Sequence, residues 1–242
     1  MMRIALKNIF ILHMVIALSG VPFHQAWTLE GNSLQVNTTF SVSIISQSQI
    51  LADLNQDQFI ECIHLGNGQL AILNNPCKKD SKVLWKSPSA WQITQAEISD
   101  LNRNGIPEVV LLAWRTFAPW PIDQYLLHPG RIDGHHTKEG KSCHIILIEY
   151  QPKGYFGESW AGSALFRPIN KFSILDLDND GLSELITLEN NYKNISQIAD
   201  TLSAWKWNGF GFQLVARNSG HYINLQAGYD VNGIPIILTS GW

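Results

Sequence analysis

Charged residues are scarce in this chain: they make up 15% of its 242 residues, and no cluster of lysine or arginine follows Arg3 and Lys7. Binding a nucleic acid requires a basic face that neutralises phosphates, so this scarcity and the net charge of −3 exclude nucleic acid as an expected partner. The sequence also lacks a Gly-x-Ser-x-Gly elbow, a P-loop, a dinucleotide fingerprint and a Cys-x-x-Cys pair. Because all of these motifs are missing, we expect a protein that is not an enzyme.

Cysteine is rare as well, with Cys62, Cys77 and Cys143 as the three copies. Three cysteines allow one disulfide bond and leave an odd thiol. Cys62 and Cys77 flank a predicted hairpin that turns at residues 66–68, which favours a bond between these two. Three unpaired thiols remain the alternative.

Long apolar runs are missing after the first 26 residues, which contain a single run at residues 9–23. Arg3 and Lys7 precede the run and a polar, turn-rich stretch follows Ala26, which is the pattern of a secretory signal peptide over residues 1–26. The run is about 15 residues long, whereas a membrane-spanning helix needs roughly 20. We therefore expect a secreted, extracellular protein with no membrane span in the mature chain. Tethering by an uncleaved N-terminal anchor is the alternative.

The remaining sequence has the composition of a turn-rich β protein. Nine tryptophans, 18 glycines and 10 prolines occur among short apolar runs. A chain of this length suits one all-β domain with a sizeable core, which we place at residues 27–242.

A nine-residue pattern occurs three times, at residues 53–61, 100–108 and 176–184, with acidic or amide side chains at positions 1, 3 and 5 and a glutamate at position 9. Ca²⁺ takes six to eight oxygen ligands at roughly 2.3 to 2.6 Å, and a tight loop supplies them from these positions and from the carbonyl at position 7. The sequence therefore predicts three calcium loops. Their expected ligands are Asp53, Asn55, Asp57, Phe59 and Glu61; Asp100, Asn102, Asn104, Ile106 and Glu108; and Asp176, Asp178, Asp180, Leu182 and Glu184.

Calcium affinity follows the number of carboxylates in a loop. The third loop has four, the first has three and the second has two, which predicts the same order of affinity. The alternative is that the Asp and Asn side chains only form self-hydrogen-bonded turns, which need no metal.

Each loop precedes an apolar strand, and the predicted strands fall into groups of four. The first three groups are 60–65, 69–73, 82–86 and 91–98; 108–114, 143–150, 155–160 and 172–175; and 185–188, 202–207, 212–216 and 222–226. A fourth, decayed copy of the loop lies at residues 230–238, where Ile236 replaces the final glutamate. The hairpin at residues 27–36 resembles residues 205–214, so we expect it to pair with the C-terminal strands and complete the last unit.

A long insertion, roughly residues 115–142, separates the second and third strands of its unit. That position puts it on the face opposite the calcium loops, and a long loop in a compact domain is usually functional or disordered. The histidines fit no zinc spacing, which disfavours metal catalysis there. The residues expected to contact a ligand are Trp120, Tyr125, His128, Arg131, His135 and His136.

These loops, each followed by an apolar strand, resemble the FG-GAP/VCBS-type repeats of integrin-α-like β-propellers. The resemblance covers residues 27–242 and implies a β-propeller of four four-stranded blades, with structural calcium between the first and second strands of a blade. Four blades are few for such a propeller, so either the ring is small or two copies cooperate as a homodimer. Gln58 departs from the family pattern, since glycine is usual at this sharp turn.

The function that the resemblance implies is that of a secreted, calcium-binding module for binding or adhesion. Its partner would be a protein or carbohydrate ligand bound around residues 115–142, on the face opposite the calcium loops. One alternative is an extracellular polysaccharide-acting enzyme that uses the same face, and another is a purely structural accessory domain.

Overall fold

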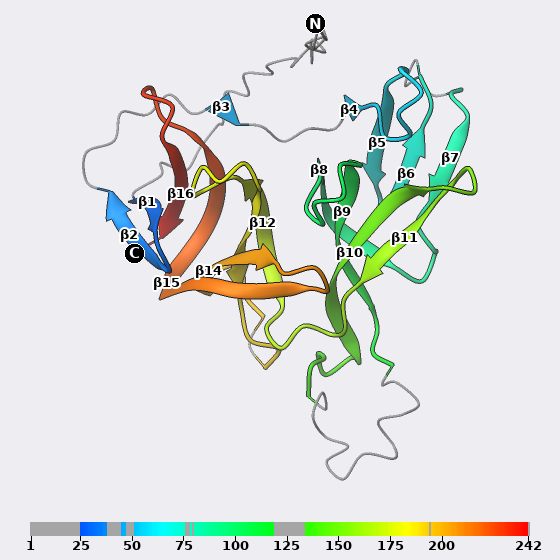
Figure 1. The fold of residues 1–242 in the computed structure, drawn as a ribbon. Coiled ribbons are helices and arrows are strands. Elements are labelled where there is room, and N and C mark those ends of the chain that lie inside the picture. Colours follow the sequence, from blue (N-terminus) through cyan, green and yellow to red (C-terminus); the bar gives the residue numbers. More distant parts are fainter. Residues whose placement is uncertain are drawn as a thin grey trace, which may run out of the picture.

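The computed structural model describes residues 25–37, 45–46, 51–75, 78, 80–118, 134–193 and 195–241. Every regular element within these ranges is a β-strand, so the predicted all-β class is confirmed (Figure 1). Most of the predicted signal peptide, residues 1–24, lies outside the described residues, while Gln25 and Ala26, predicted as its last residues, begin strand β1. Among the described residues, no helix has the length and hydropathy to cross a membrane.

The first sheet has four strands in the order β4-β5-β6-β7. Their bounds are β4 (Leu51–Ala52), β5 (Glu61–Gly66), β6 (Gln69–Leu73) and β7 (Val83–Lys86). The hairpin between β5 and β6 turns at Asn67 and Gly68, whose φ angles of 51° and 72° lie in the left-handed region that tight hairpins use. Cys62 on β5 is disulfide-bonded and Cys143 is a free, buried thiol, whereas Cys77 lies outside the described residues.

The second sheet has the order β11-β10-β9-β8. Its strands are β8 (Gln92–Ser99), β9 (Glu108–Thr116), β10 (Lys141–Gln151) and β11 (Tyr155–Ala161). Strands β9 and β10 pair out to Thr116 and Lys141, so they extend slightly into both ends of the predicted insertion. Residues 119–133 of the insertion lie outside the described residues.

The third sheet is the largest, with the order β12-β13-β14-β15-β16-β1-β2 and β3 beside β15. Its strands are β12 (Ile169–Leu175), β13 (Glu184–Glu189), β14 (Ala199–Trp207), β15 (Phe212–Tyr229), β16 (Pro235–Gly241), β1 (Gln25–Glu30), β2 (Ser33–Asn37) and β3 (Ile45–Ser46). The N-terminal hairpin pairs with the C-terminal strand, with Trp27 opposite Ile237, as predicted. The first and the last described strands, β1 and β16, are therefore joined in one sheet.

The prediction of four separate blades closed into a ring is wrong for the described strands, which form three open sheets. The third and fourth predicted units are fused because β15 is a single strand of 18 residues. It pairs with β14 through residues 212–222 and with β16 through residues 222–229, and bulges next to Ala199 and Tyr222 absorb the bend. A bulge adds twist without ending a strand, so the predicted break between residues 216 and 222 is not needed.

The units nevertheless pack face to face in chain order. One buried cluster lies between the first and second sheets and includes Leu70, Ile72, Leu111 and Ile146, while another, with Leu112 and Phe172, joins the second sheet to the third. Alternate residues of β9 enter different clusters because successive side chains point to opposite faces of a sheet. A third cluster, within the large sheet, brings the N-terminal hairpin against β13 and β14.

Candidate functional site

The three acidic loops share one pattern of hydrogen bonds. The carboxylate of residue 1 accepts the N–H groups of residues 5 and 6, the side chain of residue 3 accepts the N–H of residue 5, and the side chain of residue 5 accepts the N–H of residue 7. The final glutamate reaches back to the N–H of residue 2, at 2.8 Å in the first loop, 2.9 Å in the second and 2.8 Å in the third. These bonds curl each loop so that its side-chain oxygens gather on the inside.

The backbone of the loops repeats as closely as the hydrogen bonds. Residues 4 and 6 of every loop have positive φ angles. At position 6, Gly105 and Gly181 both have a φ of 85°, and Gln58 adopts 75° in spite of its side chain. The first loop therefore makes the same turn as the other two, although it has Gln58 in place of glycine. Its backbone is strained there, because a residue with a side chain rarely adopts a left-handed conformation.

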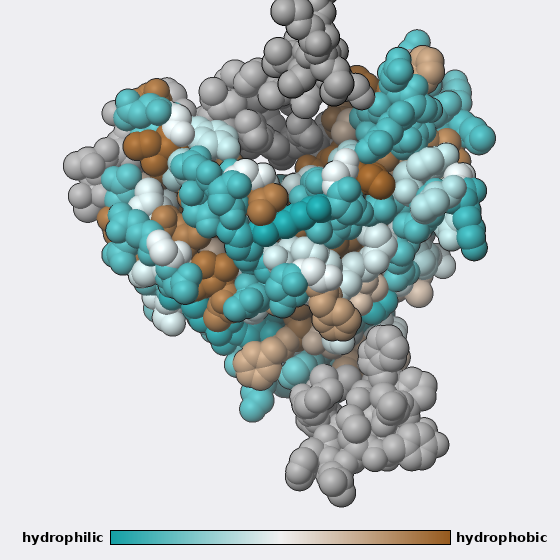
Figure 2. Space-filling model, in the orientation of Figure 1, coloured by the Kyte–Doolittle hydropathy of each residue, from teal (hydrophilic) through white to brown (hydrophobic). Residues whose placement is uncertain are grey.

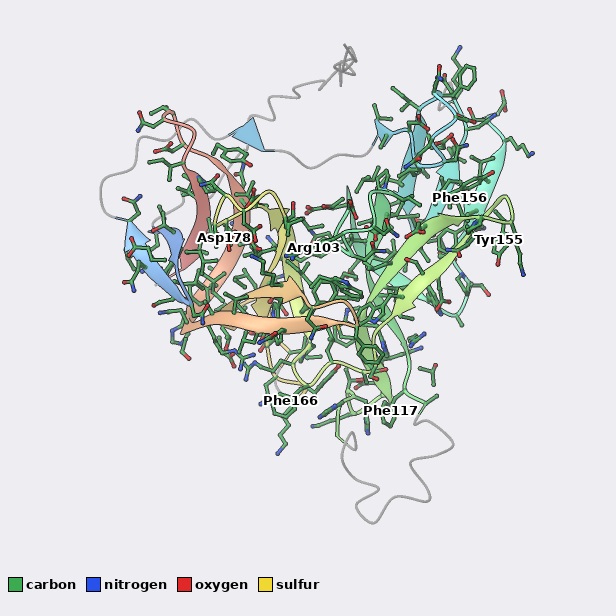
Figure 3. The ribbon with its side chains drawn as sticks, in the orientation of Figure 1. Arg103, Phe117, Tyr155, Phe156, Phe166 and Asp178 are labelled. Atoms are coloured by element: carbon green, nitrogen blue, oxygen red, sulfur yellow. The ribbon has the colours of Figure 1, made fainter. Side chains whose placement is uncertain are left out.

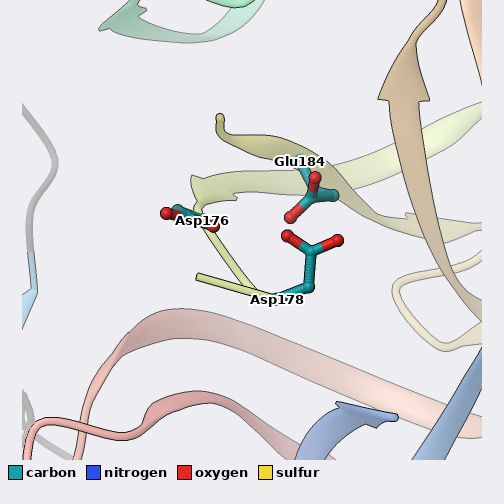
Figure 4. Close-up of side chains that lie close together, drawn as sticks. All are labelled: Asp176, Asp178 and Glu184. Carbon is teal, nitrogen blue, oxygen red and sulfur yellow. The ribbon is translucent and has the colours of Figure 1, made fainter. Parts of the chain in front are cut away.

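Only in the third loop, among the described residues, do three acidic side chains converge: ligand atoms of Asp176, Asp178 and Glu184 all lie within 4.8 Å of one another (Figure 4). Lys206 on β14 reaches into the same loop. Its Nζ lies 2.9 Å from Asp178 Oδ2, 2.5 Å from Asp180 Oδ2 and 3.4 Å from Glu184 Oε1. The Lys206 ammonium thus supplies a positive charge inside the third loop. The affinity order predicted from the number of carboxylates did not take this charge into account.

The glutamates at position 9 are buried, with exposures of 2% for Glu61 and 0% for Glu108 and Glu184. Burial raises the pKa of all three, and raises that of Glu108 to about 8, where repulsion from Asp100 and Glu149 adds to the effect. The Oε1 atom of Glu108 is buried and has no hydrogen-bond partner, whereas that of Glu184, also buried, has the Lys206 ammonium 3.4 Å away. A buried carboxylate oxygen without a donor is costly unless a cation or a proton satisfies it, so these oxygen-rich loops fit a bound Ca²⁺.

A carboxylate from outside the second loop joins it. Glu149 on β10 is 7% exposed, and its Oε2 accepts hydrogen bonds from Asn102 Nδ2 at 3.1 Å and from Asn104 Nδ2 at 2.7 Å. Glu149 therefore supplies the second loop with a third carboxylate. Sequence spacing could not reveal it, because Glu149 follows the insertion, but the pairing of β9 with β10 places it beside Glu108.

The insertion belongs to the opposite side of the molecule. Phe117, near its start, and Phe166 lie at the far end of the sheets from Arg103 and Asp178 in the acidic loops (Figure 3). His136 lies against Phe117 with a centroid separation of 4.7 Å, and His135 meets Phe166 edge-on at 5.3 Å. Four of the predicted ligand contacts lie outside the described residues, namely Trp120, Tyr125, His128 and Arg131.

A cavity of about 600 Å³ opens where the end of the insertion meets the turn between β13 and β14. Among the described residues, three cations line it, Lys138, Arg167 and Lys193, together with His135 and His136, and none of these lining residues is acidic. Both predicted histidines therefore share one concave and basic surface.

A second cavity, of about 620 Å³, lies between the second and third sheets and shares Phe166 and Arg167 with the first. Its lining is largely apolar, with Trp160, Trp205 and Phe212. The surface in the orientation of Figure 1 is otherwise mostly hydrophilic, with scattered apolar residues (Figure 2).

Comparison of the chain with protein-family models, with curated proteins and with solved structures returned no match.

Proposed function

We propose that this chain is a secreted, calcium-stabilised repeat protein of packed β-sheets that binds an acidic carbohydrate on the face opposite its calcium loops. Calcium is structural in this proposal, and the ligand surface is the basic cavity beside the insertion. The observation that carries the metal assignment is the repeated loop geometry, in which side-chain oxygens gather around a buried glutamate.

Calcium would be held by the side chains at positions 1, 3, 5 and 9 of the first and second loops, with the carbonyls of Phe59 and Ile106 at position 7. When bound, it supplies a positive charge that offsets the burial of Glu61 and Glu108 and holds each loop against the strand that follows it. The third loop offers the same oxygens around Lys206.

Thermal melting in calcium and in chelator tests the metal assignment. Calcium at a hundred times its dissociation constant stabilises a folded protein by about 2.7 kcal/mol per site, which for a chain of this size raises Tm by roughly 5 to 10 °C. We expect this rise in 2 mM CaCl₂ relative to excess EDTA, and a smaller one in MgCl₂, because Mg²⁺ gives up its bound water reluctantly. Superimposable melting curves in CaCl₂ and EDTA would refute the assignment.

The charge of the basic cavity indicates the kind of ligand. Lys138 and Lys193 suit an anion, while Arg167 is already paired with Glu189 and Asp200. The aromatic rings of Phe166 and Tyr192 suit the apolar face of a sugar ring. A polysaccharide that contains uronic acids has both features. The cavity volume of about 600 Å³ lies within the usual range for small-ligand sites.

Replacing Lys138 and Lys193 together by glutamine should weaken binding to immobilised polyuronate about tenfold, since each exposed charge contact is worth up to about 1 kcal/mol and 1.4 kcal/mol corresponds to tenfold. The matched control replaces two exposed lysines away from the cavity, Lys86 and Lys153, and should bind as the unmodified protein does. Equal affinity of the two double variants, or equal binding to neutral dextran, would contradict the proposed ligand class.

A further inference from the structure

One strand position recurs beside the three acidic loops, directly across the sheet from the glutamate at position 9. The pairs Cys62 with Leu73, Val109 with Ile148 and Leu185 with Trp205 are the last of their ladders on this side. Continuing each ladder by one residue brings Asn74, Glu149 and Lys206 to this position. We call it the cross-strand position. Its occupants differ in charge: a neutral amide, a carboxylate and an ammonium.

We propose that the cross-strand residue decides how each loop is neutralised: Asn74 and Glu149 complete calcium sites, whereas Lys206 takes the place of calcium in the third loop. This inference rests on the proposed function, since it concerns which of the loops take up the metal. It predicts that the protein binds two calcium ions.

Lys206 is built into the third loop. Its ammonium lies within 3.4 Å of oxygens from Asp178, Asp180 and Glu184, and its side chain is only 24% exposed. Burial lowers the pKa of Lys206, but the hydrogen bonds that its ammonium donates to Asp178 and Asp180 outweigh this effect and raise the pKa. An ammonium held by three carboxylates occupies the space and satisfies the charge that an entering cation would need.

In the first and second loops the cross-strand residue adds oxygen instead. The Oδ1 atom of Asn74 is buried without a hydrogen-bond partner, which leaves it available as a neutral ligand. Glu149 stands beside Glu108, whose own buried Oε1 has no partner. Two buried carboxylates that lack a cation of their own point to a cation from solution.

The charges of the three sites fit this division. With the cross-strand residue included, each site has a net formal charge of −3: three carboxylates in the first, three in the second, and four carboxylates with one ammonium in the third. The second loop, poor in carboxylates, gains one, and the third, which has the most, gains a cation. The loops alone predicted that the third would bind calcium most tightly. In this proposal the first and second loops bind calcium and the third does not.

Titration calorimetry of the chelator-treated protein with CaCl₂ tests the inference through the number of sites. We expect two sites in the unmodified protein and three in Lys206→Met, whose third loop loses its internal cation. Lys206→Met should also melt at a lower temperature than the unmodified protein in EDTA and recover in CaCl₂. The control Lys153→Met removes an exposed lysine on the turn between β10 and β11 and should keep two sites.

Glu149→Gln should weaken one of the two sites by about tenfold or more, because affinity follows the number of charged oxygens. Three sites in the unmodified protein, two in Lys206→Met, or full affinity in Glu149→Gln would each overturn the inference. The absence of calcium binding in every variant would instead refute the proposed function, so the two failures are distinguishable.

Discussion

Replacing Trp27 by alanine should lower the free energy of unfolding by about 3 to 5 kcal/mol, the range measured when a large buried aromatic side chain is removed. Trp27 is 4% exposed, and it packs edge-on against Tyr222 at a centroid distance of 6.1 Å. Its Nε1 donates a hydrogen bond of 2.9 Å to Thr239 Oγ1 on β16. The side chain thus fastens the N-terminal hairpin both to the core and to the last strand.

Urea denaturation measures this change, and Trp27→Phe is the graded control. Phenylalanine keeps an aromatic ring in the core but cannot donate to Thr239, so we expect it to cost about 1 kcal/mol beyond the small loss of buried area. A loss below about 1 kcal/mol for Trp27→Ala would show that the hairpin does not hold the large sheet together.

Replacing Glu189 by alanine should be about as destabilising, by roughly 3 to 5 kcal/mol, because it leaves the buried Thr187 hydroxyl and the Trp205 indole without this acceptor and removes the partner of two arginines. Glu189 is 2% exposed. Its Oε2 lies 3.2 Å from Arg217 Nη2 and 3.5 Å from Arg167 Nε, while its Oε1 accepts hydrogen bonds of 3.0 Å from Trp205 Nε1 and from Thr187 Oγ1. One carboxylate therefore accepts three hydrogen bonds and forms an ion pair with Arg167 at the edge of the apolar cavity.

Asp200→Ala provides the matched control, since Asp200 also pairs with Arg167 but its side chain is 51% exposed. Exposed ion pairs contribute at most about 1 kcal/mol, so the control should unfold at almost the same urea concentration as the unmodified protein. If the two substitutions had equal effects, burial would not be what makes Glu189 important.

The strands and loops of this fold could largely be predicted from the sequence because their signals are local. A loop such as residues 176–184 precedes its strand directly, and the likeness between residues 27–36 and 205–214 identified the hairpin that completes the sheet. The continuous strand β15 was missed because residues 217–221 include Asn218, Ser219 and Gly220, which have the composition of a turn. Pairing of residues 217–219 with β14, and of β15 with β16 from Tyr222 onward, keeps that segment extended.

The candidate site was predictable only in part, for a similar reason. Loop ligands such as Asp100 and Glu108 follow a fixed spacing, whereas Glu149 and Lys206 reach the loops through strand register. Register depends on where each hairpin turns, and the insertion before β10 hid it in the second unit. The basic cavity could not be predicted from any local sequence pattern. Arg167 lies between β11 and β12, whereas Lys193 lies between β13 and β14, and only the fold brings them together.

The pairing of β1 with β16 also bears on the order in which the molecule assembles. Trp27 and Thr239, joined by a hydrogen bond, are separated by 212 residues. Contacts of such long range are slow to form, and during synthesis the hairpin must wait until almost the whole chain has emerged. The first sheet, built from residues 51–86, needs no such partner. The large sheet is thus the last part of the protein to become complete. A chain that lacks the N-terminal hairpin would carry an unpaired edge on β16.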